Sequence, residues 1–195
     1  MSLVDRICQH FEDSAELKRA AAAQLAGPIA QAVEMLTAAL AADRKLLVCG
    51  NGGSAADSQH MAAELVGRFE RERPELAAIA LSTDTSALTA VANDYGFEQV
   101  FAKQVRALGR EGDVLVAIST SGQSANVLAA VHAAHEGGRA VVALTGRGGA
   151  AVRAALQGQD IHLCVPHDRT ARIQEVHLLI IHCLCDGIDA SLLGD

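Results

Sequence analysis

The sequence predicts an α/β fold: a three-layer, doubly wound sandwich with a five-stranded parallel sheet, preceded by N-terminal helices. Five short runs of residues are apolar on both faces, and helical patterns lie between them. Such alternation is typical of a parallel sheet that is covered by helices on both sides. The 195 residues are enough for one domain of this kind and too few for two ordinary domains.

Residues 1–44 precede the first predicted strand. They are predicted to form two helices, Leu3–Ala26 and Pro28–Ala42, interrupted at Gly27-Pro28. Their apolar residues recur every three or four positions and must be buried against the sheet or against a second copy of the chain. Because the many alanines permit close packing, we expect these helices to serve in oligomer packing. Residues 45–195 are expected to form the domain that binds a ligand.

The rest of the chain alternates strands with helices. Strands are predicted at Leu46–Cys49, Ala77–Leu81, Val114–Ile118, Ala140–Leu144 and Ile161–Val165. An amphipathic helix follows the first strand, and further helices are predicted at Thr85–Ala92, Phe97–Leu108, Asn126–His135, Ala150–Leu156 and Thr170–Leu193. Sheets of this class bind ligands at the carboxyl ends of their strands, where the strand order reverses. The loops at those ends are therefore the places to search for a site.

Composition excludes several classes of function. The net charge of −7 and the absence of a long basic stripe disfavour direct binding of nucleic acid. The five cysteines have no C-x-x-C spacing, as expected for reduced thiols in the cytosol. Charged residues interrupt the first twenty positions, and no eighteen apolar residues follow one another, so we expect no signal peptide and no membrane span. A soluble, cytoplasmic protein is expected.

The first candidate ligand-binding loop is the glycine-rich turn from Gly50 to Ser54, which follows the first strand. Gly52 and Gly53 would let the backbone approach a ligand closely, and Ser54 is predicted to cap the next helix. The free N–H groups at the start of that helix favour an anion. A phosphate or a sugar hydroxyl is the expected occupant.

The second candidate loop follows the third strand and runs from Ser119 to Ser124. Three serines and a threonine within six residues supply hydroxyl groups beside free backbone N–H groups, which suits a phosphate. A helix cap with spare hydroxyls is the plainer alternative. No Gly-Lys-Ser/Thr follows, so the loop is no Walker motif and nucleotide hydrolysis is not expected.

Three further groups of polar residues suggest chemistry. His60 and Glu64 lie four residues apart, on one face of the helix after the first loop, where both can reach one atom. Asn93-Asp94 ends a short helical pattern and is either a simple turn or a ligand contact. Gln174 and His182 interrupt the apolar last helix, but eight residues separate their backbones by about 12 Å. If both bind one metal, their side chains lean together, the helix bends, or they come from different subunits.

Together these motifs resemble the sugar isomerase (SIS) domain family, and within it the phosphoheptose isomerases, over nearly the whole chain. The resemblance rests on Gly50-Asn-Gly-Gly-Ser54, His60-x-x-x-Glu64, Asn93-Asp94, Ser119-Thr-Ser-Gly-x-Ser124 and Arg172-Ile-Gln-Glu-x-His177 followed by His182. It implies a flavodoxin- or Rossmann-like SIS domain over residues 45–195. It also implies conversion of D-sedoheptulose 7-phosphate into D-glycero-D-manno-heptose 7-phosphate, the first step toward ADP-heptose and the lipopolysaccharide core. A cytoplasmic homotetramer with active sites at subunit interfaces is implied as well.

The resemblance also implies roles for single residues. Glu64 and His182 would be catalytic, as base and acid. One Zn²⁺ per subunit would be held by His60, Glu64, Gln174 and His182. The sugar phosphate would contact Asn51, Gly52, Gly53, Ser54, Glu64, Asn93, Asp94, Ser119, Thr120, Ser121, Ser124 and Gln174. Some family members carry an acidic residue where this chain has Ala171.

The proposed chemistry agrees with these residue types. Aldose–ketose isomerisation moves a proton between adjacent carbons through an enediol, which requires a base, an acid and stabilisation of negative charge. A zinc ion would polarise the carbonyl, but a carboxylate that binds metal is a weaker base, so the two roles of Glu64 compete.

Two non-enzymatic alternatives share the predicted scaffold. One is a tetrameric SIS-domain partner of the bacterial replication initiator protein, and the other is a sugar-phosphate sensor. Neither requires Glu64 and His182 together, and the partner protein lacks the carboxylate and the histidine at those positions. The presence of both therefore favours an isomerase.

Overall fold

A computed structural model describes residues 1–194 and confirms the predicted fold. Five parallel strands, β1 (Leu46–Gly50), β2 (Ala78–Ala80), β3 (Val114–Ser119), β4 (Ala140–Gly146) and β5 (Ile161–Val165), form one sheet in the order β2-β1-β3-β4-β5. The order reverses between β1 and β3, whose register pairs Gly50 with Ile118. The loops after these two strands therefore leave the sheet side by side, as flavodoxin-like topology requires.

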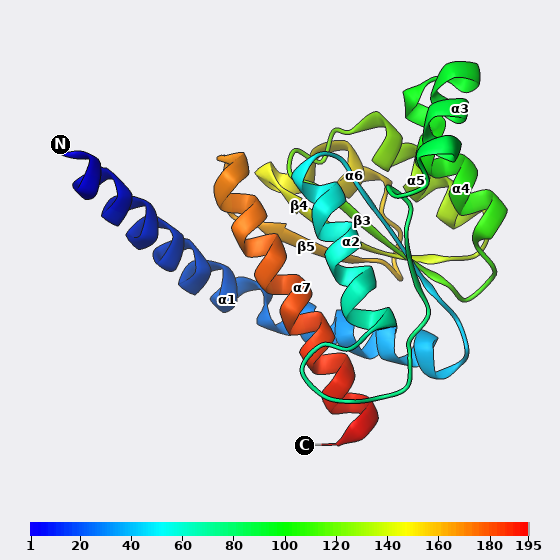
Figure 1. Cartoon of the computed structure of the whole chain (residues 1–195), viewed down its shortest axis with the longest axis horizontal. Coiled ribbons are helices and arrows are strands. Elements are labelled where there is room, and N and C mark those ends of the chain that lie inside the picture. Colours follow the sequence, from blue (N-terminus) through cyan, green and yellow to red (C-terminus); the bar gives the residue numbers. More distant parts are fainter. Residues whose placement is uncertain (195) are drawn as a thin grey trace.

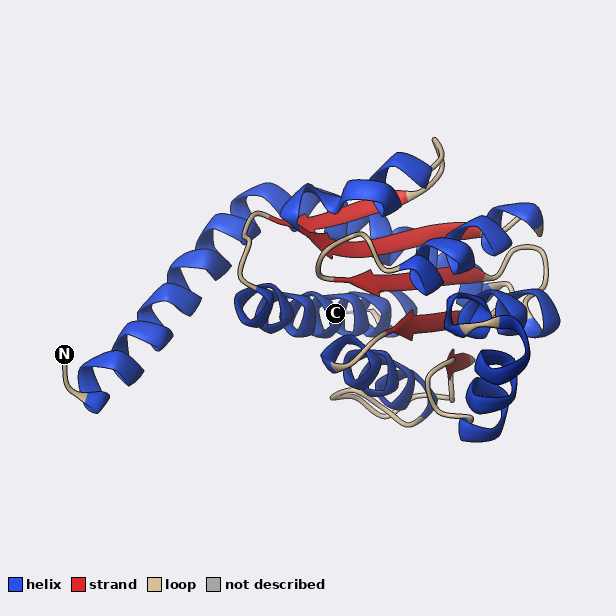
Figure 2. Ribbon diagram, turned by 90° about the horizontal axis from the view of Figure 1, so that it is seen from above, coloured by secondary structure: helices blue, strands red, loops and turns tan. Residues whose placement is uncertain are grey.

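Helices cover both faces of the sheet (Figure 2). They are α1 (Leu3–Ala41), α2 (Gly53–Val66), α3 (Thr85–Tyr95), α4 (Val100–Leu108), α5 (Ala125–Glu136), α6 (Ala150–Ala155) and α7 (Thr170–Leu193), with 3-10 turns at Phe97–Gln99 and Arg147–Gly149. One hydrophobic cluster joins the sheet to α1, α2 and α7, and a second joins its other face to α4, α5 and α6. These two clusters make the three layers, because alternate residues of the buried strands enter opposite clusters.

The N-terminal region corrects the sequence prediction. It forms a single helix of 39 residues that continues through Gly27 and Pro28, instead of two helices. A proline inside a helix costs about 3 kcal/mol. Burial offsets that cost, because the apolar stripe is continuous on both sides of the proline, with Leu25 before it and Val33 after it. In Figure 1 the first half of α1 extends away from the rest of the molecule.

Among the helix boundaries that differ from the prediction, two affect the candidate site. Ser54 was expected to cap α2, but Gly52 occupies the N-cap position with a φ of 57°, and Ser54 lies inside the first turn with its side chain buried. Helix α3 runs to Tyr95 and ends at Gly96, whose φ is 89°. Asn93 and Asp94 therefore belong to the last turn of a helix, which excludes the simple turn considered for them.

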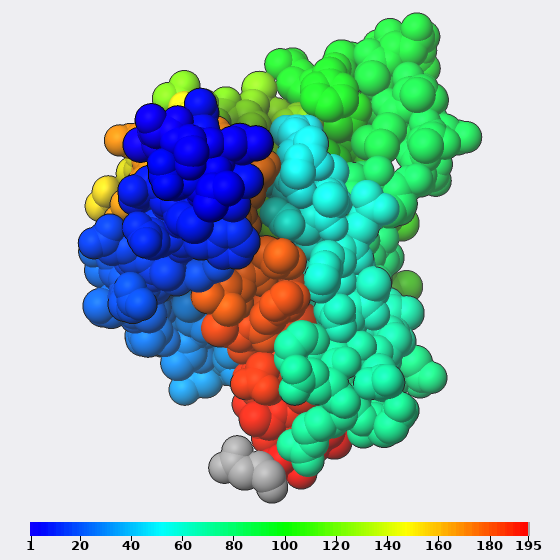
Figure 3. Space-filling model, turned by 60° about the vertical axis from the view of Figure 1, so that its left-hand side comes forward, coloured from blue at the N-terminus to red at the C-terminus, as the bar shows by residue number. Residues whose placement is uncertain are grey.

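Helix α7 is long and apolar enough, by length and composition, to cross a membrane. Its position explains that composition, because it packs against α1, α2 and the sheet and buries ten of its residues. Figure 3 shows α7 (orange to red) between α1 (blue) and the cyan to teal region formed by α2 and the segment after it. Helix α7 is thus a core helix of this fold.

Candidate functional site

The two predicted loops meet at the point where the strand order reverses. Asn51, after β1, and Asn126, in the first turn of α5, exchange two hydrogen bonds of 2.8 Å between their side-chain amides. Asn126 is buried. A reciprocal amide pair satisfies a donor and an acceptor of each side chain, so it fixes the two loops relative to each other. Asn126 is not among the predicted site residues, although its place directly after the serine-rich loop is a signal that could have indicated it.

The first loop is closely packed at Gly53, whereas Gly52 has no neighbour within 4 Å of an added β-carbon. The N–H groups of Ser54 and Ala55 donate to the carbonyls of Asn51 and Gly52 at 3.0 Å, so they are not the free donors that were predicted. A β-carbon on Gly53 would lie 2.5 Å from Nε2 of Gln174. The amide of Gln174 therefore lies against this turn, and a larger residue at position 53 would require that side chain to move.

The second loop holds its hydroxyl groups close together. The Oγ atoms of Ser119 and Ser124 are 3.0 Å apart, and the N–H of Gln123 donates to Oγ of Ser121 at 3.2 Å. Ser124 stands at the N-cap of α5, yet its side chain makes no capping hydrogen bond. The partly buried Thr120 completes the set. A helix cap with spare hydroxyls does not account for this arrangement, because the Ser124 hydroxyl faces Ser119 instead of the helix.

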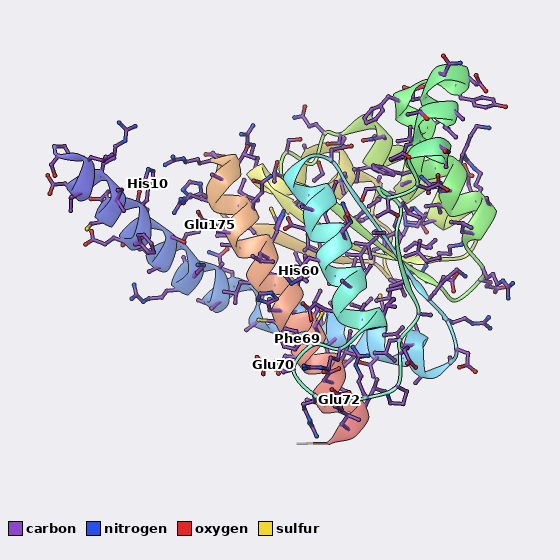
Figure 4. All side chains as sticks on the ribbon, in the orientation of Figure 1. His10, His60, Phe69, Glu70, Glu72 and Glu175 are labelled. Carbon is purple, nitrogen blue, oxygen red and sulfur yellow. The ribbon has the colours of Figure 1, made fainter. Side chains whose placement is uncertain are left out.

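His60, Glu64 and His182 lie together between α2 and α7. Nε2 of His60 is 3.1 Å from Oε1 of Glu64 and 3.2 Å from Nε2 of His182. The ring of Phe69, from the segment after α2, lies 5.7 Å from that of His182. Figure 4 labels His60 on α2 beside α7, with Phe69 further along the chain. Both residues predicted to be catalytic thus reach the same imidazole.

The electrostatics of this group include one half-buried carboxylate. Burial raises the pKa of Asp57, one turn before His60 on α2, and the charge of His60 acts in the opposite direction. Oδ2 of Asp57 is buried and has no hydrogen-bond partner within residues 1–194. The face of α2 that carries His60 therefore holds acidic groups on both sides of it.

The donor chemistry of the three side chains fits a zinc ion. Tetrahedral zinc with bonds of about 2.0–2.1 Å holds its ligand atoms roughly 3.3 Å apart. The two separations from His60 Nε2 are 3.1 and 3.2 Å. In the described part of the chain, however, no three His, Cys, Asp or Glu side chains surround one point as a finished metal site does. Instead, His60 lies between Glu64 and His182 and contacts each of them.

Gln174 lies apart from these three residues. It contacts Gly53 at the start of α2, whereas His182 contacts His60 further along the same helix. Because α7 is one continuous helix, the backbones of Gln174 and His182 stay about 12 Å apart. The structure thus places Gln174 at the first loop, and its role as a metal ligand stays a prediction.

Asn93 and Asp94 are exposed on α3, a helix with no buried residue. The Asn93 amide donates to Oδ1 of Asp94 at 2.8 Å. Among residues 1–194, this bond between the two is the one that either side chain forms with a predicted site residue. Their role in ligand binding also stays a prediction.

Comparison with known proteins identifies the family. A model of the SIS domain matches residues 9–146. The phosphoheptose isomerases of Azoarcus sp. (strain BH72) and Dechloromonas aromatica (strain RCB) are 67% and 62% identical over 194 residues, which is all of this chain and 98% and 99% of theirs.

Solved structures agree with these relatives. The structure of phosphoheptose isomerase from Neisseria gonorrhoeae is 58% identical, with a TM-score of 0.93 over 97% of this chain and all of its own. That of the Francisella tularensis phosphoheptose isomerase is 49% identical, with a TM-score of 0.94 over 97% of this chain and 99% of its own. The chain belongs to the SIS-domain family and, within it, to the phosphoheptose isomerases.

Proposed function

We propose that the protein converts D-sedoheptulose 7-phosphate into D-glycero-D-manno-heptose 7-phosphate. The observation that carries this proposal is the contact of Glu64 and His182 with His60, in a chain 67% identical to a phosphoheptose isomerase. The reaction would be the first step toward ADP-heptose and the lipopolysaccharide core.

The residues supply the chemistry that an aldose–ketose isomerase requires. The loop from Ser119 to Ser124 binds the phosphate, because its hydroxyls and the N–H groups at the start of α5 favour an anion. Glu64 takes a proton from one carbon and returns it to the adjacent carbon of the enediol, while His182 gives a proton to the carbonyl oxygen and recovers one from the neighbouring hydroxyl. Gln174 and the first loop orient the sugar, since Gln174 already contacts Gly53.

We propose that His60, Glu64 and His182 hold one Zn²⁺ per subunit, with Gln174 as the fourth ligand. Bound zinc would act as a Lewis acid that polarises the carbonyl and stabilises developing negative charge. Support comes from the donor separations around His60. Because Gln174 lies against Gly53, a side-chain movement or a Gln174 from a neighbouring subunit is required to complete the set.

We further propose a cytoplasmic homotetramer with active sites at subunit interfaces. The first half of α1 exposes Leu3, Val4, Ile7 and Phe11. An apolar groove of about 560 Å³, which includes Leu25 and Leu179, runs between α1 and α7. Packing against other copies would bury these surfaces. Light scattering should then give four times the chain mass of 20.3 kDa.

The non-enzymatic alternative, a tetramer that binds the replication initiator protein, is not favoured. Its scaffold does not need a carboxylate and a histidine that meet at His60, and the relatives described above are isomerases.

Turnover followed by NMR tests the proposal. Purified protein and sedoheptulose 7-phosphate should yield an aldoheptose phosphate, and a chelator should stop the reaction until Zn²⁺ is added. Turnover that a chelator does not change would support the isomerase function and refute the proposed role of zinc. No turnover with or without zinc, in an intact oligomer, would refute the proposed function.

A further inference from the structure

Arg73 is a buried arginine in the segment between α2 and β2. Its side chain is 1% exposed, and all three guanidinium nitrogens donate hydrogen bonds. Nε donates to Oδ1 of Asp189 at 2.6 Å, Nη2 to the Glu64 carbonyl at 2.7 Å, and Nη1 to the carbonyls of Leu65 and Pro74 at 2.8 and 3.1 Å. In Figure 3 this segment (teal) lies against the C-terminal half of α7 (red).

These bonds link the two helices that carry the candidate catalytic residues. Helices α2 and α7 run in the same direction, since Gly53 contacts Gln174 and, further along both helices, His60 contacts His182. Asp189 lies seven residues after His182 and hence on the same face of α7. Arg73 thus connects the C-terminal end of α2 to α7. This connection lies further along both helices than the contact between His60 and His182.

Two of the groups that accept hydrogen bonds from Arg73 belong to the last turn of α2, which contains Glu64. Carbonyls in the last turn of a helix have no partner within that helix and favour a cation. Arg73 binds two carbonyls of this last turn, those of Glu64 and Leu65. The bond to the Glu64 carbonyl therefore fixes the backbone from which the Glu64 carboxylate extends toward His60.

Stability alone is a weak reason for this arrangement. Asp189 is 2% exposed, and a buried ion pair is often no more stabilising than well-packed apolar residues of similar size. What an arginine adds is directional bonding, because its planar fork holds several acceptors at once in one geometry.

We propose that Arg73 is a positioning residue, which holds the Glu64 carboxylate at its distance from His182 without touching the substrate. This inference rests on the proposed isomerase function. The two candidate ligand-binding loops lie at the other end of α2, and none of the hydrogen bonds of Arg73 reaches them. Its removal should therefore lower kcat and leave KM for the sugar phosphate nearly unchanged.

The test compares Arg73→Met, Arg73→Lys and Asp189→Asn with the control Asp113→Asn. Asp113 is 1% exposed and pairs with Lys45 at 2.7 Å, so its loss destabilises the fold away from the site. We expect kcat per folded enzyme to fall about 10²-fold in Arg73→Met, since displacements near 1 Å cost that much. KM should stay within about twofold. Arg73→Lys should recover part of kcat, and Asp113→Asn should lower Tm while keeping kcat.

A second measurement does not need turnover. Ring ¹⁵N resonances of His60 and His182 report their mutual contact, and they should shift in Arg73→Met but not in Asp113→Asn. If the wild-type protein lacks isomerase activity, the proposed function fails, and the ring resonances still decide the positioning role. If Arg73→Met does not fold, Arg73→Lys and Asp189→Asn carry both measurements.

Two results would overturn the positioning role. One is a kcat within about threefold of the wild type in folded Arg73 variants. The other is a fall in kcat without any change in the ring resonances, because Arg73 acts only through that geometry.

Discussion

Replacing Glu64 with glutamine removes the proposed base and puts a neutral amide in place of the carboxylate that is also a proposed zinc ligand. The amide keeps the size of the side chain and an oxygen that faces Nε2 of His60 at the present 3.1 Å, but it cannot accept a proton as a base. General acid–base catalysis typically contributes about 10²–10⁴-fold. We therefore expect kcat to fall at least 10²-fold in Glu64→Gln, measured by NMR with saturating sedoheptulose 7-phosphate.

Folding and substrate binding should survive this change. The His60–Glu64 pair lies near the surface, with side chains 38% and 25% exposed, so its loss costs roughly 0–1 kcal/mol. The backbone carbonyl of Glu64 keeps its bond to Arg73. Because the second loop is untouched, calorimetry should give a Kd for the sugar phosphate close to that of the wild type.

The matched control is Glu136→Gln, which removes an exposed carboxylate paired with Arg106 and should leave kcat unchanged. A Glu64→Gln enzyme that turns over within about threefold of the wild type would refute the role of Glu64 as base. A kcat loss accompanied by an equal loss of binding would assign Glu64 to ground-state binding instead.

Three further predictions concern the loops and the core. Ser121→Ala should raise KM about tenfold, through loss of one hydrogen bond to a charged phosphate, and a normal KM would count against this loop as the phosphate site. Asn126→Asp should raise KM and lower kcat, because a carboxylate cannot donate a hydrogen bond to Asn51; activity equal to the wild type would show that the amide pair is dispensable. Burial lowers the pKa of His177 to about 4, so the unfolded chain binds the extra proton first as the pH falls. The free energy of unfolding should then decrease from about pH 6.5 to pH 4, by up to about 3 kcal/mol, and His177→Gln should flatten this part of the profile in urea titrations.

Sequence patterns predicted most of the fold because the strands are apolar on both faces. The limits of β5 and α7 agree with the structure at every residue, and those of the other strands within two residues. The errors occurred where local signals compete with packing. Pro28 predicts a break, yet the continuous apolar stripe of α1 keeps the helix intact. Ser54 predicts a cap, yet Gly52 takes that position because the chain turns sharply with a positive φ.

Local patterns are enough to predict the parallel α/β class, the two glycine- and serine-rich loops, and the i,i+4 pair of His60 and Glu64, since each depends on residues close together in the chain. Which distant residues meet depends on how the elements pack. The tertiary structure brought His182 to His60, Gln174 to Gly53, and Arg73 to both Glu64 and Asp189. These contacts depend on how α2 and α7 pack in register, and helical periodicity fixes the face of a residue but not its partner on another helix.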